Sequence, residues 1–121
     1  NEEMPSLIEL LRLDQAAFRK KFHDSPILRA KRVGLLRSAA IALGNHPSAS
    51  GDVPAGLASL CGVLQDKEPV IRGAAAWALG QWHYRMPEIA PTIVDALKAR
   101  LAEEYDETVR QEIFSVLSHK E

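Results

Sequence analysis

The 121 residues suffice for one domain with a buried core, and a content of 46% hydrophobic and 26% charged residues is ordinary for a globular chain. No apolar run is long enough to cross a bilayer, and the start of the sequence has no secretory pattern. The single cysteine, Cys61, excludes an internal disulfide framework and is typical of a reducing compartment. We therefore expect a cytoplasmic protein with no membrane partner.

The formal net charge of −1 conceals an uneven distribution. The segment from Arg12 to Arg37 contains eight basic and two acidic residues, a balance of +6, so the rest of the chain is strongly acidic. A basic segment on an otherwise acidic domain gives polyanions a preferred side. Charge alone leaves the alternative open, which is a set of solvated helix faces with no partner.

Apolar residues recur with helical spacing along the whole chain, and no strand alternation persists. In chain order, the spacing predicts helices over residues 4–11, 14–22, 26–44, 57–64, 71–82, 89–101 and 109–117. Prolines stand near the starts of four helices, at Pro26, Pro54, Pro69 and Pro87. Residues 46–54, HPSASGDVP, are rich in turn formers and are interpreted as a connection within one domain.

An internal repeat organises these helices. The segments LLRSAAIALGN, VIRGAAAWALGQ and TVRQEIFSVLSH align, with Arg37, Arg72 and Arg110 in the same place at intervals of 35 and 38 residues. An acid, Asp66 or Glu104, precedes each of the last two arginines by six residues. Units of this length with two helices each predict an all-α fold, a HEAT-like α-α superhelix (α-solenoid) of about seven helices forming a single domain over residues 1–121.

The repeat also predicts roles for its commonest residues. We expect Arg72 and Arg110 to pair with a neighbouring acid or to bind carbonyl groups of the adjacent repeat. Small residues such as Ala75 allow the second helix of one unit to approach the next closely. Trp77, Trp82 and Cys61 are predicted to pack in the core or between repeats.

Residues 10–81 carry a more specific pattern. It consists of Phe18 and Phe22, then SPILRAKRVGLLRSAAIALGN, and later DKEPVIRGAAAWALGQ. This stretch resembles the C-terminal HEAT-like region of epoxyqueuosine reductases, which are cobalamin-dependent iron–sulfur enzymes that complete queuosine on the wobble base of certain tRNAs. Ser38 and Val33 depart from the family pattern, where an Asn and a basic residue are expected.

The resemblance implies that this sequence is a non-catalytic C-terminal piece of a longer oxidoreductase. Iron–sulfur clusters require several cysteines, and the chain has one. The clusters and the cobalamin are therefore expected in the missing N-terminal part, with no cofactor, metal or catalytic residue here. The four histidines are far apart and show no ligand spacing.

The resemblance further implies that this region helps to hold tRNA near the anticodon stem-loop through its phosphates, and that it contacts its own catalytic domain. The residues predicted to bind nucleic acid are Arg19, Lys20, Lys21, Arg29, Lys31, Arg32 and Arg37. The alternative is a HEAT-repeat scaffold for protein–protein interaction, in which the basic residues bind an acidic partner. A third possibility, an enzyme of the bilin-lyase type, has no chromophore site to mark it.

Overall fold

The computed structural model describes residues 7–12 and 26–118, with side chains described from residue 30 onward in the second range. These residues form six α-helices and two short 3-10 helices, with no strand among them, so the predicted all-α fold is confirmed. The elements are α1 (Leu7–Leu11), α3 (Pro26–Asn45), η1 (Pro47–Ser50), α4 (Val53–Val63), α5 (Pro69–Arg85), η2 (Pro87–Ile89), α6 (Ala90–Glu103) and α7 (Glu107–Leu117). The predicted helix over residues 14–22, with Phe18 and Phe22, lies outside the described residues.

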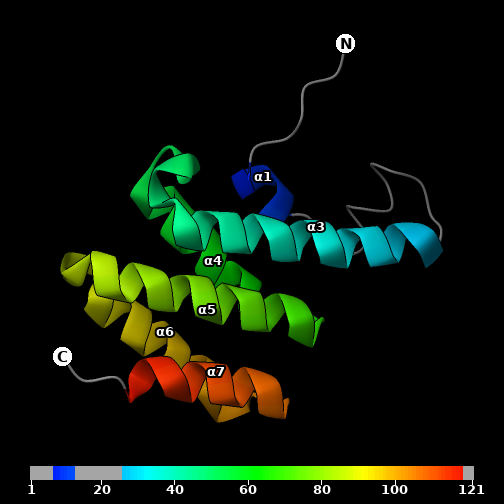
Figure 1. Ribbon diagram of the computed structural model, residues 1–121. Coiled ribbons are helices and arrows are strands. Elements are labelled where there is room, and N and C mark those ends of the chain that lie inside the picture. Colours follow the sequence, from blue (N-terminus) through cyan, green and yellow to red (C-terminus); the bar gives the residue numbers. More distant parts are fainter. Residues whose placement is uncertain (1–6, 13–25, 119–121) are drawn as a thin grey trace.

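The helices form two layers, as a helical repeat requires. Helices α3, α5 and α7 lie side by side in one layer, with their N-terminal ends at the same edge, and α4 and α6 lie behind them (Figure 1). Contacts between α3 and α5 and between α5 and α7 are the most extensive in the described part of the chain. Each hairpin, α4–α5 and α6–α7, therefore adds one unit to the stack.

Local sequence signals fix where the helices begin. The Asp52 carboxylate accepts a hydrogen bond from the backbone N–H of Ala55 at 3.0 Å, and Asp106 accepts one from Val109 at the same distance. Each bond satisfies one of the N–H groups left unpaired at a helix start. Pro69 opens α5, where its missing N–H has no cost.

Glycines set the distance between neighbouring helices in the front layer. A Cβ built on Gly44 of α3 would lie 2.6 Å from the ring of Trp77, and one on Gly80 of α5 would lie 2.6 Å from Cγ2 of Val116. The sequence predicts a helix over residues 26–44, and α3 ends one residue later, at Asn45. Gly44 itself is buried inside the helix, however, and its role is close packing against α5.

The core is a continuous layer of small and branched residues between the two rows of helices. The largest fully buried side chain is that of Trp82, whose indole Nε1 donates to the carbonyl of Leu43 at 2.7 Å. Ala75 is fully buried as well, as expected for a residue packed between repeats. Cys61 packs partly buried against this core, and burial raises the pKa of its thiol.

Candidate nucleic-acid interface

An arginine–carboxylate pair joins each pair of successive repeats. Arg72 of α5 donates from Nε and Nη2 to the two carboxylate oxygens of Glu104, at 2.8 and 2.7 Å. Its third nitrogen, Nη1, donates to the carbonyl of Asp66 at 2.8 Å. The predicted structural role of Arg72 is thus confirmed, and the acid comes from the following repeat.

The same arrangement joins α3 to the following unit. Arg32 forms an ion pair with Asp66 through both carboxylate oxygens, with Nη1 3.3 Å from Oδ2. Asp66 Oδ2 also accepts a hydrogen bond from the backbone N–H of Glu68 at 3.0 Å. Glu104 is used in the same way, since its Oε2 accepts from the N–H of Asp106 at 3.0 Å.

Burial and hydrogen bonding act in opposite directions on Glu104. Its side chain is fully buried, and burial alone would raise the pKa of a carboxyl group. The hydrogen bonds from Arg72 and from the N–H of Asp106 outweigh this effect, so the pKa of Glu104 lies below its ordinary value. In turn, the bonds to Glu104 raise the pKa of Arg72. The pair is charged at neutral pH.

Arg110 occupies the equivalent position in α7. Its Nη1 donates to the carbonyls of Leu101 and Glu104, at 3.1 and 2.9 Å, as Arg72 donates to Asp66. Arg110 therefore binds carbonyl groups as predicted, but these belong to its own repeat and not to the adjacent one. Arg37 differs from both, because its side chain is exposed and Arg32 makes the inter-repeat pair in α3.

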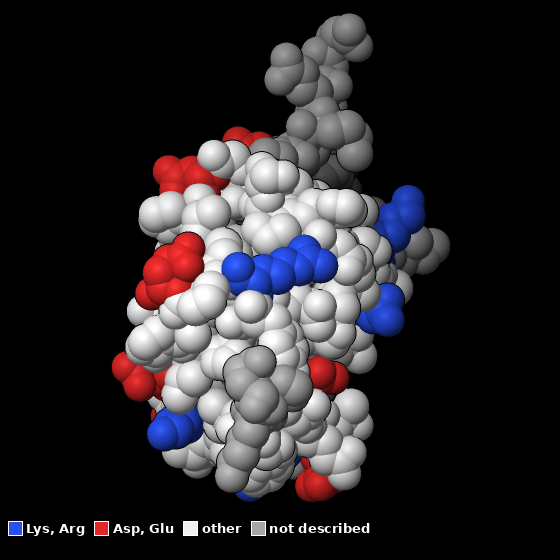
Figure 2. Space-filling model, turned by 60° about the vertical axis from the view of Figure 1, so that its left-hand side comes forward, with Lys and Arg blue, Asp and Glu red and all other residues white. Residues whose placement is uncertain are grey.

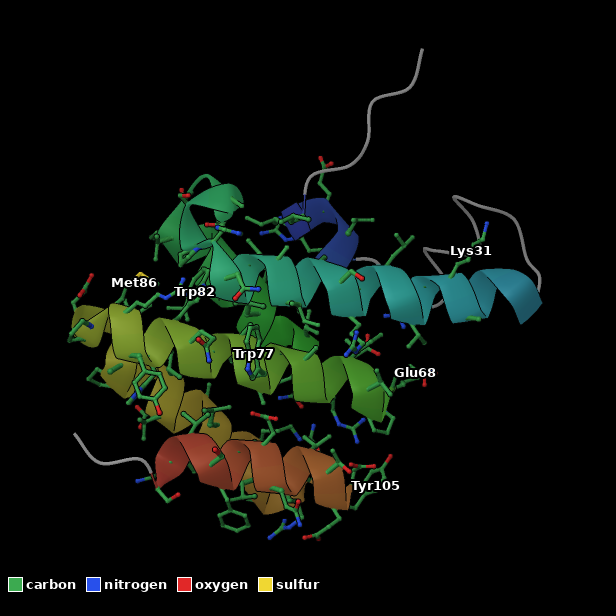
Figure 3. The ribbon with its side chains drawn as sticks, in the orientation of Figure 1. Lys31, Glu68, Trp77, Trp82, Met86 and Tyr105 are labelled. Atoms are coloured by element: carbon green, nitrogen blue, oxygen red, sulfur yellow. The ribbon has the colours of Figure 1, made fainter. Side chains whose placement is uncertain are left out.

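The structure separates the predicted nucleic-acid-binding residues into three groups. Arg32 is only 2% exposed and is bound to Asp66, so it joins two repeats and is not part of the exposed surface of α3. Lys31 and Arg37 are exposed on α3, and Figure 3 shows Lys31 pointing away from α5. Arg19, Lys20 and Lys21 lie outside the described residues, as does the side chain of Arg29.

The exposed side of α3 is basic and carries no acid. The helix contains four cations, Arg29, Lys31, Arg32 and Arg37, and no Asp or Glu. Within the described part of the chain, Lys31 and Arg37 make no ion pair. Gly34 and Leu35 between them, and Ser38 directly after Arg37, are exposed, and a Cβ on Gly34 would meet nothing within 4 Å.

Helix α5 also lacks acids, yet its two arginines are bound to protein groups. Arg72 pairs with Glu104, and Arg85 Nη1 donates to the carbonyl of Asn45 at 2.7 Å, at the C-terminal end of α3. On the face shown in Figure 2, basic and acidic side chains are separated by uncharged surface and form no continuous patch of one sign. Among the described helices, α3 is the one that carries two exposed cations, Lys31 and Arg37, with no bond to another described group.

The chain does not have the residues that an iron–sulfur cluster needs. Its one cysteine cannot supply four thiolate ligands, and Cys61 lies against the core. In the described residues, no group of three or more His, Cys, Asp or Glu side chains could hold a metal ion. No described helix is long and apolar enough to span a membrane.

Two layers of antiparallel helices joined by arginine–carboxylate pairs at a regular interval define a helical-repeat protein. The family described as HEAT repeats matches residues 26–118. The chain belongs to the HEAT-repeat family and is a helical-repeat scaffold. Comparison with curated proteins and with solved structures gave no match.

Proposed function

We propose that this scaffold binds tRNA through phosphates along the exposed side of α3, as an auxiliary domain of an epoxyqueuosine reductase-like protein. The observation that carries the proposal is an acid-free helix with two exposed cations, Lys31 and Arg37, that form no ion pair with any residue that the structure describes. The resemblance of residues 10–81 to that family supports the choice of tRNA. The redox chemistry, the clusters and the cobalamin belong in this proposal to an N-terminal part that the sequence does not contain.

Contacts of this kind supply affinity with little base readout. Lysine and arginine bound to phosphates release counterions, so each phosphate contact adds to the salt dependence of binding. Discrimination among tRNAs then comes from RNA shape and from other parts of the protein. We therefore expect similar affinities for a tRNA with a GUN anticodon and for one with another anticodon.

The test is fluorescence anisotropy of this chain with a labelled GUN-anticodon tRNA at two salt concentrations. The variant Lys31→Glu/Arg37→Glu should lose at least about tenfold in affinity and show a shallower salt dependence. The matched control is Thr92→Glu/Lys98→Glu/Ala99→Glu, which changes the net charge equally at exposed positions of α6 and should retain binding better. Equal losses in both variants would show an effect of net charge alone and contradict the proposed surface.

The rival function is a scaffold for an acidic protein partner on the same helix. Leu35, 37% exposed beside Lys31 on α3, favours it, because protein interfaces combine apolar and charged contacts. Absence of tRNA binding at low salt would remove the RNA proposal and favour this function.

A further inference from the structure

The series of arginine–carboxylate pairs is incomplete at α7. Arg32 binds the carboxylate of Asp66, and Arg72 binds that of Glu104, each acid lying in the turn of the next unit. Arg110 is the next arginine in the series, 38 residues after Arg72. In the described part of the chain, no carboxylate binds its guanidinium.

The guanidinium of Arg110 is nevertheless held in place. Its Nη1 binds the carbonyl of Leu101 in the last turn of α6 and that of Glu104 just after the helix, and Cζ lies 5.5 Å from the centre of the Phe114 ring. In Arg72 the corresponding Nη1 contact to Asp66 leaves Nε and Nη2 directed at Glu104. The carbonyl contacts of Nη1 therefore orient Arg110 as they orient Arg72. Its planar fork of N–H donors is suited to bind a carboxylate, as Arg72 does.

We infer that Arg110 and the outer face of α7 form a binding site for a carboxylate-bearing turn of a partner protein. The inference is independent of the proposed RNA surface on α3, so either can fail alone. It extends an interface that already exists twice in this molecule, in which a turn supplies one acid to an arginine of the preceding unit.

The shape of α7 favours a turn over another closely packed helix. Gly73 and Gly80 of α5 face Val109 and Val116 of α7 and allow the two helices to approach. The residues equivalent to these two glycines in the next repeat, 38 positions later, are Gln111 of α7 and Ser118, which follows the helix. Both are exposed. These larger side chains hold a neighbouring helix further from α7 than the glycines hold α7 from α5, whereas a turn can reach Arg110. Phe114, 47% exposed, offers an apolar contact beside it.

The surrounding charge restricts the partner further. Glu103 and Glu107 are exposed near the site and repel additional acids. The established pair at Arg72 tolerates such surroundings, since Asp66 and Glu68 lie in the adjacent turn, where Lys67 stands between them. The turn that supplies Glu104 to Arg72 is itself an acidic run, residues 103–107. A turn like that of Asp66, where Lys67 follows the acid, meets less repulsion from Glu103 and Glu107 and is the favoured partner.

The chain supplies a probe with this chemistry. A fluorescein-labelled peptide of residues 63–75, VLQDKEPVIRGAA, contains Asp66 next to Lys67 and has no formal net charge. Its binding to the whole chain is measured by fluorescence anisotropy. The expected result is saturable binding that falls at least about tenfold with the Asp66→Asn peptide and with the Arg110→Gln protein.

Three further measurements make the result decisive. Arg85→Gln, which removes another carbonyl-bound arginine, is the control variant and should leave peptide binding unchanged. Circular dichroism reports whether Arg110→Gln remains folded. If this variant does not fold, NMR of the unmodified protein is the readout instead: the Arg110 Nε–Hε resonance should shift when the peptide is added.

Two outcomes would overturn the inference. One is peptide binding that is absent, or that Arg110→Gln and Asp66→Asn leave unchanged. The other is self-association of the unmodified chain in sedimentation that Arg110→Gln abolishes, because the occupant would then be a second copy of this chain.

Discussion

Arg72 and Glu104 meet across the boundary between two repeats as a bidentate, buried ion pair, with both nitrogen–oxygen distances under 3 Å at 2.8 and 2.7 Å. Arg100, one helical turn before Glu104, places its Nε 3.2 Å from the same carboxylate. The backbone N–H of Asp106 completes the set of donors around Glu104. A buried carboxylate with all of these partners depends on each of them, because burial without pairing is costly.

Removing the arginine should therefore destabilise the whole stack. We expect Arg72→Met to lower the free energy of unfolding by about 3–5 kcal/mol, since Glu104 would remain buried without its main partner. Urea denaturation measures the change. Lys98→Met, an exchange at an exposed position of α6, should stay within about 0.5 kcal/mol of the unmodified protein. A loss below about 1 kcal/mol for Arg72→Met would contradict this role.

The same pair predicts how stability responds to acid. The pKa of Glu104 is lower in the folded chain than in the unfolded one, because the bonds from Arg72 and Asp106 outweigh the effect of burial. The stabilisation is complete above the unfolded pKa, which is about 4.3 for a glutamate, and it is lost as the pH falls through the folded pKa. Glu104→Gln should make the free energy of unfolding less dependent on pH in this acid range. Glu88→Gln, at an exposed site, should retain the full dependence.

The helices and their boundaries were largely predictable, because each signal is local. Apolar spacing located α4 to α7, and proline at a helix start marked Pro69 of α5. The prediction differs at residues 46–54, where turn formers fold into η1 and Gly51 has φ of 78°. Such detail depends on contacts with neighbouring helices, which the local pattern does not contain.

The arginine register shows where local similarity misleads. Sequence alignment places Arg37 opposite Arg72, whereas the close contacts of Gly44 and Gly80 set the true correspondence. Eight residues before Gly80 is Arg72, and eight before Gly44 is Leu36. Arg32 lies one turn earlier on the same face as Leu36, so it reaches the acid of the next turn. The partner, Asp66, is 34 residues away, and only the folded chain brings the two together.

The sequence predicts which cations lie on α3, but not which of them are exposed. The sequence shows that α3 has cations and no acid, but exposure divides them, since Lys31 faces solvent and Arg32 is buried. The alternation along a helix indicates two faces without saying which face the neighbouring helix covers.

Two glycines of the same helix should respond in opposite ways to alanine. A Cβ at Gly44 would lie 2.6 Å from the Trp77 ring and 2.9 Å from Cα of Ala78, so α3 and α5 must move apart. We expect Gly44→Ala to cost about 1–3 kcal/mol. Gly34→Ala has open space around it and should gain up to about 1 kcal/mol from helix propensity. Thermal denaturation of the two variants checks the pair, and a stabilising Gly44→Ala would show that the helices separate at little cost.

Glu112 of α7 should influence stability in the direction opposite to Glu104. Burial raises the pKa of its carboxyl group, so the folded chain disfavours the charged form. Its stabilising effect is present below the unfolded pKa and is lost as the pH rises through the folded pKa. Glu112→Gln removes this charge and should raise the melting temperature at neutral pH, with the advantage disappearing in acid. Glu88→Gln serves as the exposed control. A melting temperature for Glu112→Gln that falls at neutral pH would mean that the carboxylate has a favourable partner and that burial does not dominate its energetics.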